Sequence, residues 1–289
     1  MQMVYHIGVH GTDGDRMLKT LLNNRGRLLR DRTEVVTPNR HRGVFEEALA
    51  ALNGGPATPE MEQIMQDAVL DSDDPLRVIC TSPGFLGVPS RAIGPEGLYP
   101  QAGARIAALT NLFPSAGAEF FVAIRNPVTL IADVLDLHGG DYASLMGGVD
   151  PLSLSWLTAV QRMAAGAQGR RLVVWCHEDA PIIWPDVVRL VGGLPPSEPL
   201  PGGLLYMHEM LGDQGLRELR GALAGRELPV SQRRDLYAEH LQRNALPHMV
   251  EQDIALPGWT QETVDQITAR YYQDIPQIAA LPGVEFILA

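Results

Sequence analysis

Short apolar runs alternate with segments of helical periodicity along residues 1–192. Each run has the length of a buried strand, and the segments between the runs place apolar side chains three or four residues apart. Strands separated by helices form a parallel sheet with helices on both faces. The sequence therefore predicts an α/β domain with a doubly wound, mostly parallel sheet. The expected strands are residues 3–9, 33–38, 75–82, 118–125 and 170–176.

Signals for helix starts lie between these runs. Residues 15–29 carry leucine and methionine at helical spacing, and Thr58 before Pro59 has the form of a capping residue followed by proline at the first helical position. Pro127 and the pair Asp150 and Pro151 open further expected helices. These signals support the alternation of strand and helix.

The pattern changes after residue 192. Residues 191–203, VGGLPPSEPLPGG, form a turn-rich connector, and the segments that follow are mainly helical in pattern. The last residues, GVEFILA, fit either an edge strand or a packed tail. We expect residues 193–289 to form a helical C-terminal cap that packs on the sheet domain of residues 1–192, so that the two make one structural unit.

Composition limits the classes of partner. The chain is 45% hydrophobic, as in ordinary globular proteins, and its formal charge is -11. A strongly negative protein is a poor ligand for nucleic acids or anionic membranes. The N-terminus lacks the pattern of a signal peptide, and no long apolar run has the length of a membrane span. We therefore expect a cytoplasmic protein with no nucleic-acid or membrane partner, whose oligomeric state is open.

Two cysteines, Cys80 and Cys176, each end an apolar run. Two buried, reduced thiols are the favoured interpretation, and a disulfide or redox pair is the alternative. Neither zinc-type cysteine spacing, nor a serine hydrolase elbow, nor a G-x-x-x-x-G-K-[ST] loop is present.

Ligands of open parallel sheets bind beyond the carboxyl ends of the strands. Polar residues follow four of the expected strands, at positions 10–16, 81–87, 125–127 and 176–179. A further polar group, Arg40, His41 and Arg42, precedes an apolar helical segment, where it lines an anionic acceptor site or lies in a solvated loop. These places hold the candidate site residues.

Three segments carry a resemblance to a known family. HIGVHGTDGDRMLKTLLNNRGRL, residues 6–28, resembles the opening of bacterial sulfotransferases, in which a strand leads through His-Lys-Thr-Gly-Thr-Thr into a helix. FFVAIRNPVTLIADVL, residues 120–135, is similar to the family's second donor-binding segment, and residues 172–194 resemble a later stretch with a Glu-Asp pair. The three occur in the family's order.

The resemblance implies a P-loop-like fold and the donor 3'-phosphoadenosine 5'-phosphosulfate, from which a sulfuryl group moves to a hydroxyl or amine. In the family, amides at a helix N-terminus and a lysine hold the 5'-phosphosulfate. By the same resemblance, Arg125 and a residue eight positions later hold the 3'-phosphate. His10 is the tentative catalytic base, and the expected donor-binding residues are Gly11, Thr12, Asp13, Gly14, Asp15, Arg16, Arg125 and Asp133.

The donor-binding motifs depart from the family's pattern. Gly11 stands at the lysine position, Asp13 at a glycine, Asp15 at a threonine or serine, and Asp133 at the serine. A carboxylate about 5 Å from a phosphate charge costs about 3 kcal/mol at an effective dielectric near 20. Arg16 could take over the lysine's role, or a divalent cation could bridge the acids and the donor. Otherwise Asp13 or Asp15 caps the helix, and the loop is liganded by the chain itself.

Structural roles compete with functional ones at each candidate residue. Asp15 is favoured as a helix cap over a metal ligand or a catalytic acid, because an aspartate at a helix start needs no further cause. The calcium-loop pattern that Asp13 and Asp15 begin is not continued. His6 fits the core, Arg125 has Asp133 as an internal partner, and Glu178 or Asp179 is favoured as a cap of the next helix. No metal site is expected.

Two functions follow from these residues. The favoured one is a sulfotransferase-like protein that no longer binds the phosphosulfate donor and serves as a non-catalytic or altered-ligand binding protein for a small molecule or another protein. The alternative is an active sulfotransferase that uses 3'-phosphoadenosine 5'-phosphosulfate. Acids folded into the loop would favour the first, and a vacant pocket lined by amides the second.

Overall fold

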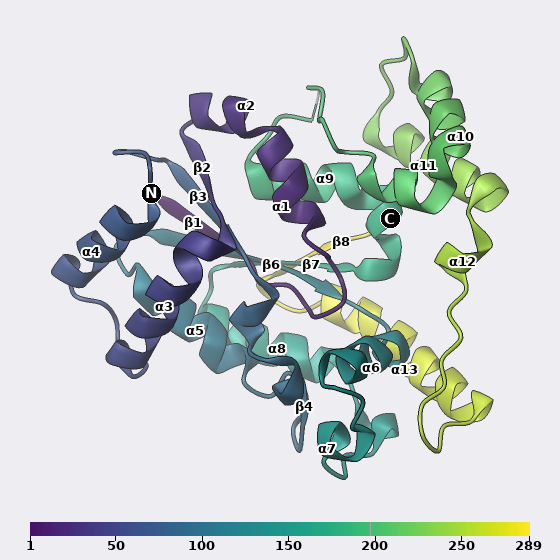
Figure 1. The fold of residues 1–289 in the computed structure, drawn as a ribbon, viewed down its shortest axis with the longest axis horizontal. Coiled ribbons are helices and arrows are strands. Elements are labelled where there is room, and N and C mark those ends of the chain that lie inside the picture. Colours follow the sequence, from purple (N-terminus) through teal and green to yellow (C-terminus); the bar gives the residue numbers. More distant parts are fainter. Residues whose placement is uncertain (197) are drawn as a thin grey trace.

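The computed structural model describes residues 1–196 and 198–289 and contains one six-stranded parallel sheet (Figure 1). The strand order is β2-β3-β1-β6-β7-β8, so that β1 lies between β3 and β6. The prediction of an α/β chain with a parallel sheet is confirmed. The strands are β1 Gln2–His6, β2 Thr33–Val36, β3 Arg77–Thr81, β6 Gly117–Ile124, β7 Arg171–Cys176 and β8 Val284–Ile287, and a separate hairpin joins β4 Ile93–Gly94 to β5 Gly97–Leu98.

Helices connect these strands. The described residues also contain the 3-10 turns η1 Pro83–Leu86, η2 Pro89–Arg91, η3 Pro151–Ser153 and η4 His177–Asp179. The helices are α1 Arg16–Asn23, α2 Arg25–Arg30, α3 Pro38–Leu52, α4 Pro59–Val69, α5 Ala102–Leu112, α6 Pro127–Leu137, α7 Tyr142–Met146, α8 Trp156–Ala167, α9 Ala180–Gly192, α10 Leu205–Leu223, α11 Val230–Asn244, α12 Pro247–Val250 and α13 Gln261–Ala279.

The sheet is buried on both faces. In β1, Met3 and Tyr5 belong to the larger core, to which α3, α5, α8 and α13 contribute, whereas Val4 faces a second core with α1 and α9. Side chains alternate between the faces of a strand, so burial of both faces requires apolar residues at successive positions. This explains why the strands read as continuous apolar runs.

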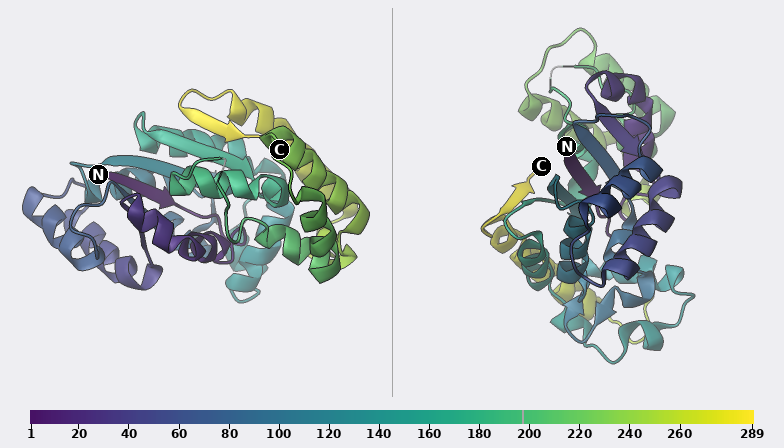
Figure 2. Two further views of the ribbon diagram at one scale, coloured as in Figure 1. Left: turned by 90° about the horizontal axis from the view of Figure 1, so that it is seen from above. Right: turned by 90° about the vertical axis from the view of Figure 1, so that its left-hand side faces the viewer.

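The C-terminal part combines helices with one strand. Residues 284–287 form β8, which pairs in parallel with β7 and lies at the edge of the sheet (Figure 2). Helix α13 packs on α8 and α6, while α10 and α11 pack on each other and on α9. The edge-strand interpretation of the last residues is therefore correct, and the segment beyond residue 192 adds helices beside α8 and beside α9 as well as the edge strand β8.

The first expected helix, residues 15–29, is interrupted. It divides into α1 and α2 at Asn24, whose side-chain Nδ2 donates to the carbonyls of Thr20 at 2.7 Å and Pro201 at 2.9 Å. The second bond ties the break to the connector that precedes α10. Apolar periodicity continues through the break, which is why the sequence pattern did not reveal it.

Both cysteines are buried and free. Burial raises the pKa of the Cys80 thiol well above its ordinary range and that of Cys176 to about 12. The prediction of two reduced, buried thiols is confirmed. Within the described residues, no helix has both the length and the apolar character needed to cross a membrane.

Candidate functional site

The candidate site lies where the chain leaves β1 and β6. These two strands are neighbours in the sheet. The strands that follow β1 in the chain, β2 and β3, lie on the opposite side of β1 from β6. The edge between β1 and β6 is therefore the topological switch point of the sheet. The loop after β1, residues 7–15, here called the β1 loop, meets Arg125 and the start of α6 at this edge. The sheet thus brings the two expected donor-binding segments together.

Asp13 is the acid that caps the first helix. Its Oδ1 accepts a hydrogen bond from the backbone N–H of Met17 at 2.9 Å, and burial raises the pKa of its carboxyl group. Asp15 is exposed, has a left-handed backbone with φ of 64°, and makes no capping bond through its side chain. The favoured cap at Asp15 is therefore wrong, and the alternative cap at Asp13 is correct, because Asp13 lies one turn before Met17.

Arg125 is held by internal partners. Its Nη1 donates to the carbonyl of Gly11 at 2.7 Å and forms an ion pair with Asp133, and its Nε donates to Oγ1 of Thr129 at 2.8 Å. The residue is only 8% exposed. Arg125 thus joins the β1 loop to α6, as the competing interpretation of its role predicted.

Gly11 leaves no space for a side chain. Its φ is +73°, and a Cβ atom added there would lie 2.6 Å from Oδ2 of Asp133 and 2.8 Å from Nη1 of Arg125. This is the position at which the resemblance places the donor-binding lysine. Any side chain at this position would therefore begin in contact with the Arg125–Asp133 pair.

Replacing Gly11 with alanine is expected to lower the free energy of unfolding by about 2 kcal/mol, because alanine disfavours positive φ and its methyl group would displace the ion pair. Denaturant unfolding followed by circular dichroism measures the change. Gly26→Ala is the control: Gly26 lies in α2 with nothing within 4 Å of an added Cβ, so the substitution should stabilise by up to about 1 kcal/mol. Equal stability of Gly11→Ala and wild type would contradict the close packing.

Arg16, which the sequence offered as a substitute for the lysine, is engaged by internal partners. Its Nε and Nη2 donate to Oε2 of Glu209 at 2.8 and 2.6 Å, and its Nη1 donates to the carbonyl of Asp13 at 2.8 Å. The guanidinium also lies 4.7 Å over the ring of Tyr206, whose hydroxyl donates to the carbonyl of Thr12 at 2.7 Å. The β1 loop is thereby fastened to α10, and three consecutive carbonyls, those of residues 11–13, accept hydrogen bonds from side chains.

His10 and His6 are both buried beside the sheet. Nδ1 of His10 lies 2.9 Å from the hydroxyl of Tyr99, and Nδ1 of His6 lies 2.7 Å from Oγ1 of Thr81. Burial lowers the pKa of each imidazole. His6 belongs to the core as expected, whereas His10, the tentative base, lies outside the cavity described next.

A cavity of about 400 Å³ opens beside the β1 loop. We call it the β1–α10 cavity. Its walls come from the β1 loop, the start of α1, the end of β6, α6, η4, α9, α10 and the segment around α12. Its lining residues are Gly11, Arg16, Arg125, Thr129, Asp133, His177, Glu178, Pro181, Tyr206, Glu209, Met210, Met249, Val250 and Gln252. Of the predicted site residues, only Gly11, Arg16, Arg125 and Asp133 line it.

The charges of this cavity do not favour an anion. Arg16 and Arg125 are each engaged by a carboxylate, and a third carboxylate, Glu178, adds a further negative charge. Burial and the charges of Arg125 and Arg16 lower the pKa of His177 to about 3, so this imidazole is neutral at pH 7. The lining therefore carries one net negative charge.

Glu178 joins the start of α6 to α13 and does not cap α9. Its Oε1 accepts from the backbone N–H of Asn126 at 2.8 Å, and its Oε2 accepts from the hydroxyl of Tyr271 at 2.8 Å. Asp179 precedes α9 but makes no capping bond through its side chain. The expected cap at either residue is wrong, because Glu178 reaches across the sheet edge to the start of α6.

The polar group at residues 40–42 lies inside α3, not in a solvated loop. His41 is fully buried there, and Arg42 is exposed.

Among residues 1–196 and 198–289, no three metal-ligating side chains gather at one point. No family model matches the chain, and neither the curated proteins nor the solved structures contain a match to it.

Proposed function

We propose that this chain has a sulfotransferase-like fold in which the phosphosulfate donor site is closed by the protein's own side chains, so that it acts as a binding protein for a different ligand. The strand order around β1 and the meeting of the β1 loop with Arg125 support the fold assignment. The proposed ligand is a small molecule or a peptide segment that is uncharged or cationic.

One observation carries the proposal. The Arg125–Asp133 pair lies against the point where a side chain at residue 11, the position of the family's lysine, would begin. At the same place, the Asp13 carboxylate accepts the amide of Met17 at the N-terminus of α1. An internal carboxylate thus takes the position that the donor's anionic group would need.

Electrostatics points in the same direction. The β1–α10 cavity has three carboxylates and two arginines, and each arginine is already paired. A carboxylate about 5 Å from a phosphate costs about 3 kcal/mol at an effective dielectric near 20. The apolar residues that line the β1–α10 cavity suit the hydrocarbon part of a neutral or cationic ligand. They are Met210, Met249, Val250 and Pro181.

An active sulfotransferase is the second candidate. In its favour, Arg125 and Arg16 both line one cavity at the switch point of the sheet. Binding of 3'-phosphoadenosine 5'-phosphosulfate would require Asp133 to leave Arg125 and the β1 loop to turn its amides toward the ligand. Both changes break interactions that are present without ligand, and this candidate is therefore second.

A cytoplasmic location stays a prediction.

The test is a calorimetric titration of the wild-type protein with adenosine 3',5'-bisphosphate, with and without magnesium. We expect no binding heat up to about 1 mM ligand, a limit equivalent to roughly -4 kcal/mol of binding free energy. The magnesium arm tests whether a divalent cation bridges the acids and the ligand. Micromolar binding in either arm would overturn the closed-site proposal and favour the active enzyme.

A further inference from the structure

One asparagine of the chain is followed by glycine. Asn53 comes directly after the last residue of α3 and precedes Gly54 and Gly55. Every other asparagine is followed by a residue that has a side chain. A glycine has no Cβ atom to limit its approach to the side chain before it. Asn53 is therefore the asparagine whose side-chain amide lies most open to the next backbone nitrogen.

The turn that carries Asn53 is exposed. Both Asn53 and Gly54 are exposed, and a Cβ atom added at Gly54 would meet nothing within 4 Å. Asn53 has a left-handed backbone, with φ of 46° and ψ of 42°, and φ of Gly54 is +86°. The turn thus has room for the rotation about ψ of Asn53 that brings the Gly54 nitrogen to the asparagine side chain.

The two groups that would react are free of hydrogen bonds. Within residues 1–196 and 198–289, neither the side chain of Asn53 nor the backbone N–H of Gly54 has a partner. The bonds of this turn lie elsewhere: the carbonyl of Gly54 accepts from Nδ2 of Asn111 at 2.9 Å, and the N–H of Gly55 donates to the carbonyl of Leu52 at 2.9 Å. Turns at helix ends open locally at little cost, so these bonds slow the rotation without preventing it.

We propose that Asn53 is a site of spontaneous deamidation. The Gly54 nitrogen, after losing its proton to solvent, attacks Cγ of Asn53, and the bond from Cγ to Nδ2 breaks. Nδ2 takes up a proton and leaves as ammonia, and a succinimide ring remains. Water then opens this ring at one of its two carbonyls, which gives aspartate or isoaspartate at residue 53. The step consumes one water and needs no oxidant, reductant or cofactor.

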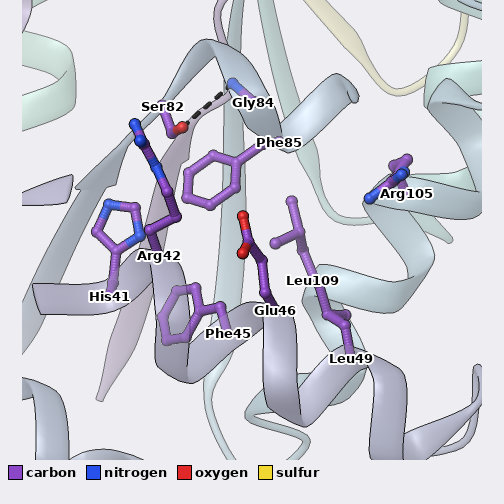
Figure 3. Close-up of a pocket in the computed structure, with 10 residues that line it drawn as sticks. All are labelled: His41, Arg42, Phe45, Glu46, Leu49, Ser82, Gly84, Phe85, Arg105 and Leu109. Carbon is purple, nitrogen blue, oxygen red and sulfur yellow. Dashed lines mark hydrogen bonds between the residues drawn. The ribbon is translucent and has the colours of Figure 1, made fainter. Parts of the chain in front are cut away.

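The modification adds a negative charge at the C-terminal end of α3. The helix dipole is also negative there, and the last turn of α3 contains no basic residue. Phe45 and Leu49 of this helix line a pocket together with Phe85 and Leu109 of the neighbouring elements (Figure 3). A weakened helix end therefore loosens this packing, whereas none of these residues lines the β1–α10 cavity.

The experiment incubates the full chain at mildly alkaline pH and maps its peptides by mass spectrometry, with enzymatic methylation of isoaspartate as a second readout. We expect Asn53 to convert at least about tenfold faster than Asn39. Asn39 is the internal control, because it is an exposed asparagine of the same helix, and the N–H of the next residue, Arg40, donates to the carbonyl of Thr37 at 2.9 Å. Conversion of Asn39 as fast as Asn53, or no conversion at Asn53, would overturn the proposal.

Two variants separate the site from its consequence. Asn53→Gly suits the left-handed backbone and has no side-chain amide, so this variant should melt no lower than wild type and form no isoaspartate at residue 53. Asn53→Asp carries the charge of one product and should melt about 1–3 °C below wild type. Isoaspartate formed by Asn53→Gly as fast as by wild type would place the reaction elsewhere. An unchanged melting temperature of Asn53→Asp would contradict the destabilising effect on α3.

Discussion

Arg125→Ala is expected to lower the free energy of unfolding by about 3 kcal/mol in the absence of any ligand. The guanidinium is buried and joins Gly11, Thr129 and Asp133. Its removal leaves the carboxylate of Asp133 unpaired and the carbonyl of Gly11 without its donor. An arginine kept for an external anion would show the opposite behaviour, because its removal would relieve unpaired positive charge.

Urea unfolding followed by circular dichroism measures this effect. Arg217→Ala is the matched control, because Arg217 is an exposed residue of α10, and its replacement should change stability by less than about 0.5 kcal/mol. If Arg125→Ala were as stable as wild type, Arg125 would not be a structural clamp, and the case for an open anion site would be strengthened.

Asp274→Ala is expected to destabilise the chain by about 3 kcal/mol and to lower the melting temperature by about 5–10 °C. Asp274 is 5% exposed, and its Oδ2 accepts hydrogen bonds from the hydroxyl of Ser155 and the amide of Trp156, both at 2.8 Å, and from the amide of Leu157 at 3.2 Å. A carboxylate of α13 thus caps the N-terminus of α8.

The comparison variant for this prediction is Asp265→Ala. Asp265 lies on the exposed side of the same helix, where it accepts a bond from Gln261, and its removal should cost no more than about 0.5 kcal/mol. Differential scanning calorimetry distinguishes the two variants. A loss at Asp274 no larger than the loss at Asp265 would show that α13 is not held to α8 by this cap.

The sheet could be predicted because its signal is local. Strands buried on both faces must be apolar throughout, so each appeared as a continuous run, and the parallel arrangement followed from the helices between them. The short strand β8 was ambiguous, since four residues fit a strand or a tail equally well. Its place beside β7 is decided by tertiary packing of α13 against α8, which local sequence does not encode.

The site was predictable only where its partners lie close in sequence. Asp133 follows Arg125 by eight residues on a helix, and this spacing pointed to the internal pair. The Arg16–Glu209 pair and the bond from Tyr206 to Thr12 join residues almost 200 positions apart. No local sequence pattern could therefore indicate these contacts.

The misplaced group at residues 40–42 did have a local signal. Thr37 followed by Pro38 has the same form as Thr58 followed by Pro59, and both prolines stand at the start of a helix. Application of that rule at Thr37 would have placed His41 on α3. The helix then fixes which face of the element enters the core.

The central claim is that Asp133, by holding Arg125 against the β1 loop, keeps the donor site closed. Its most direct test is calorimetry of adenosine 3',5'-bisphosphate with Asp133→Ser, which restores the residue that the resemblance expects. Removal of the carboxylate should bring the Kd from above about 1 mM, where the wild type gives no binding heat, to about 10 μM, a gain of about 100-fold. Asp136→Ser, at an exposed acid on the same helix, is the control and should bind no better than wild type. A folded Asp133→Ser protein that binds no more tightly than the control would contradict the claim.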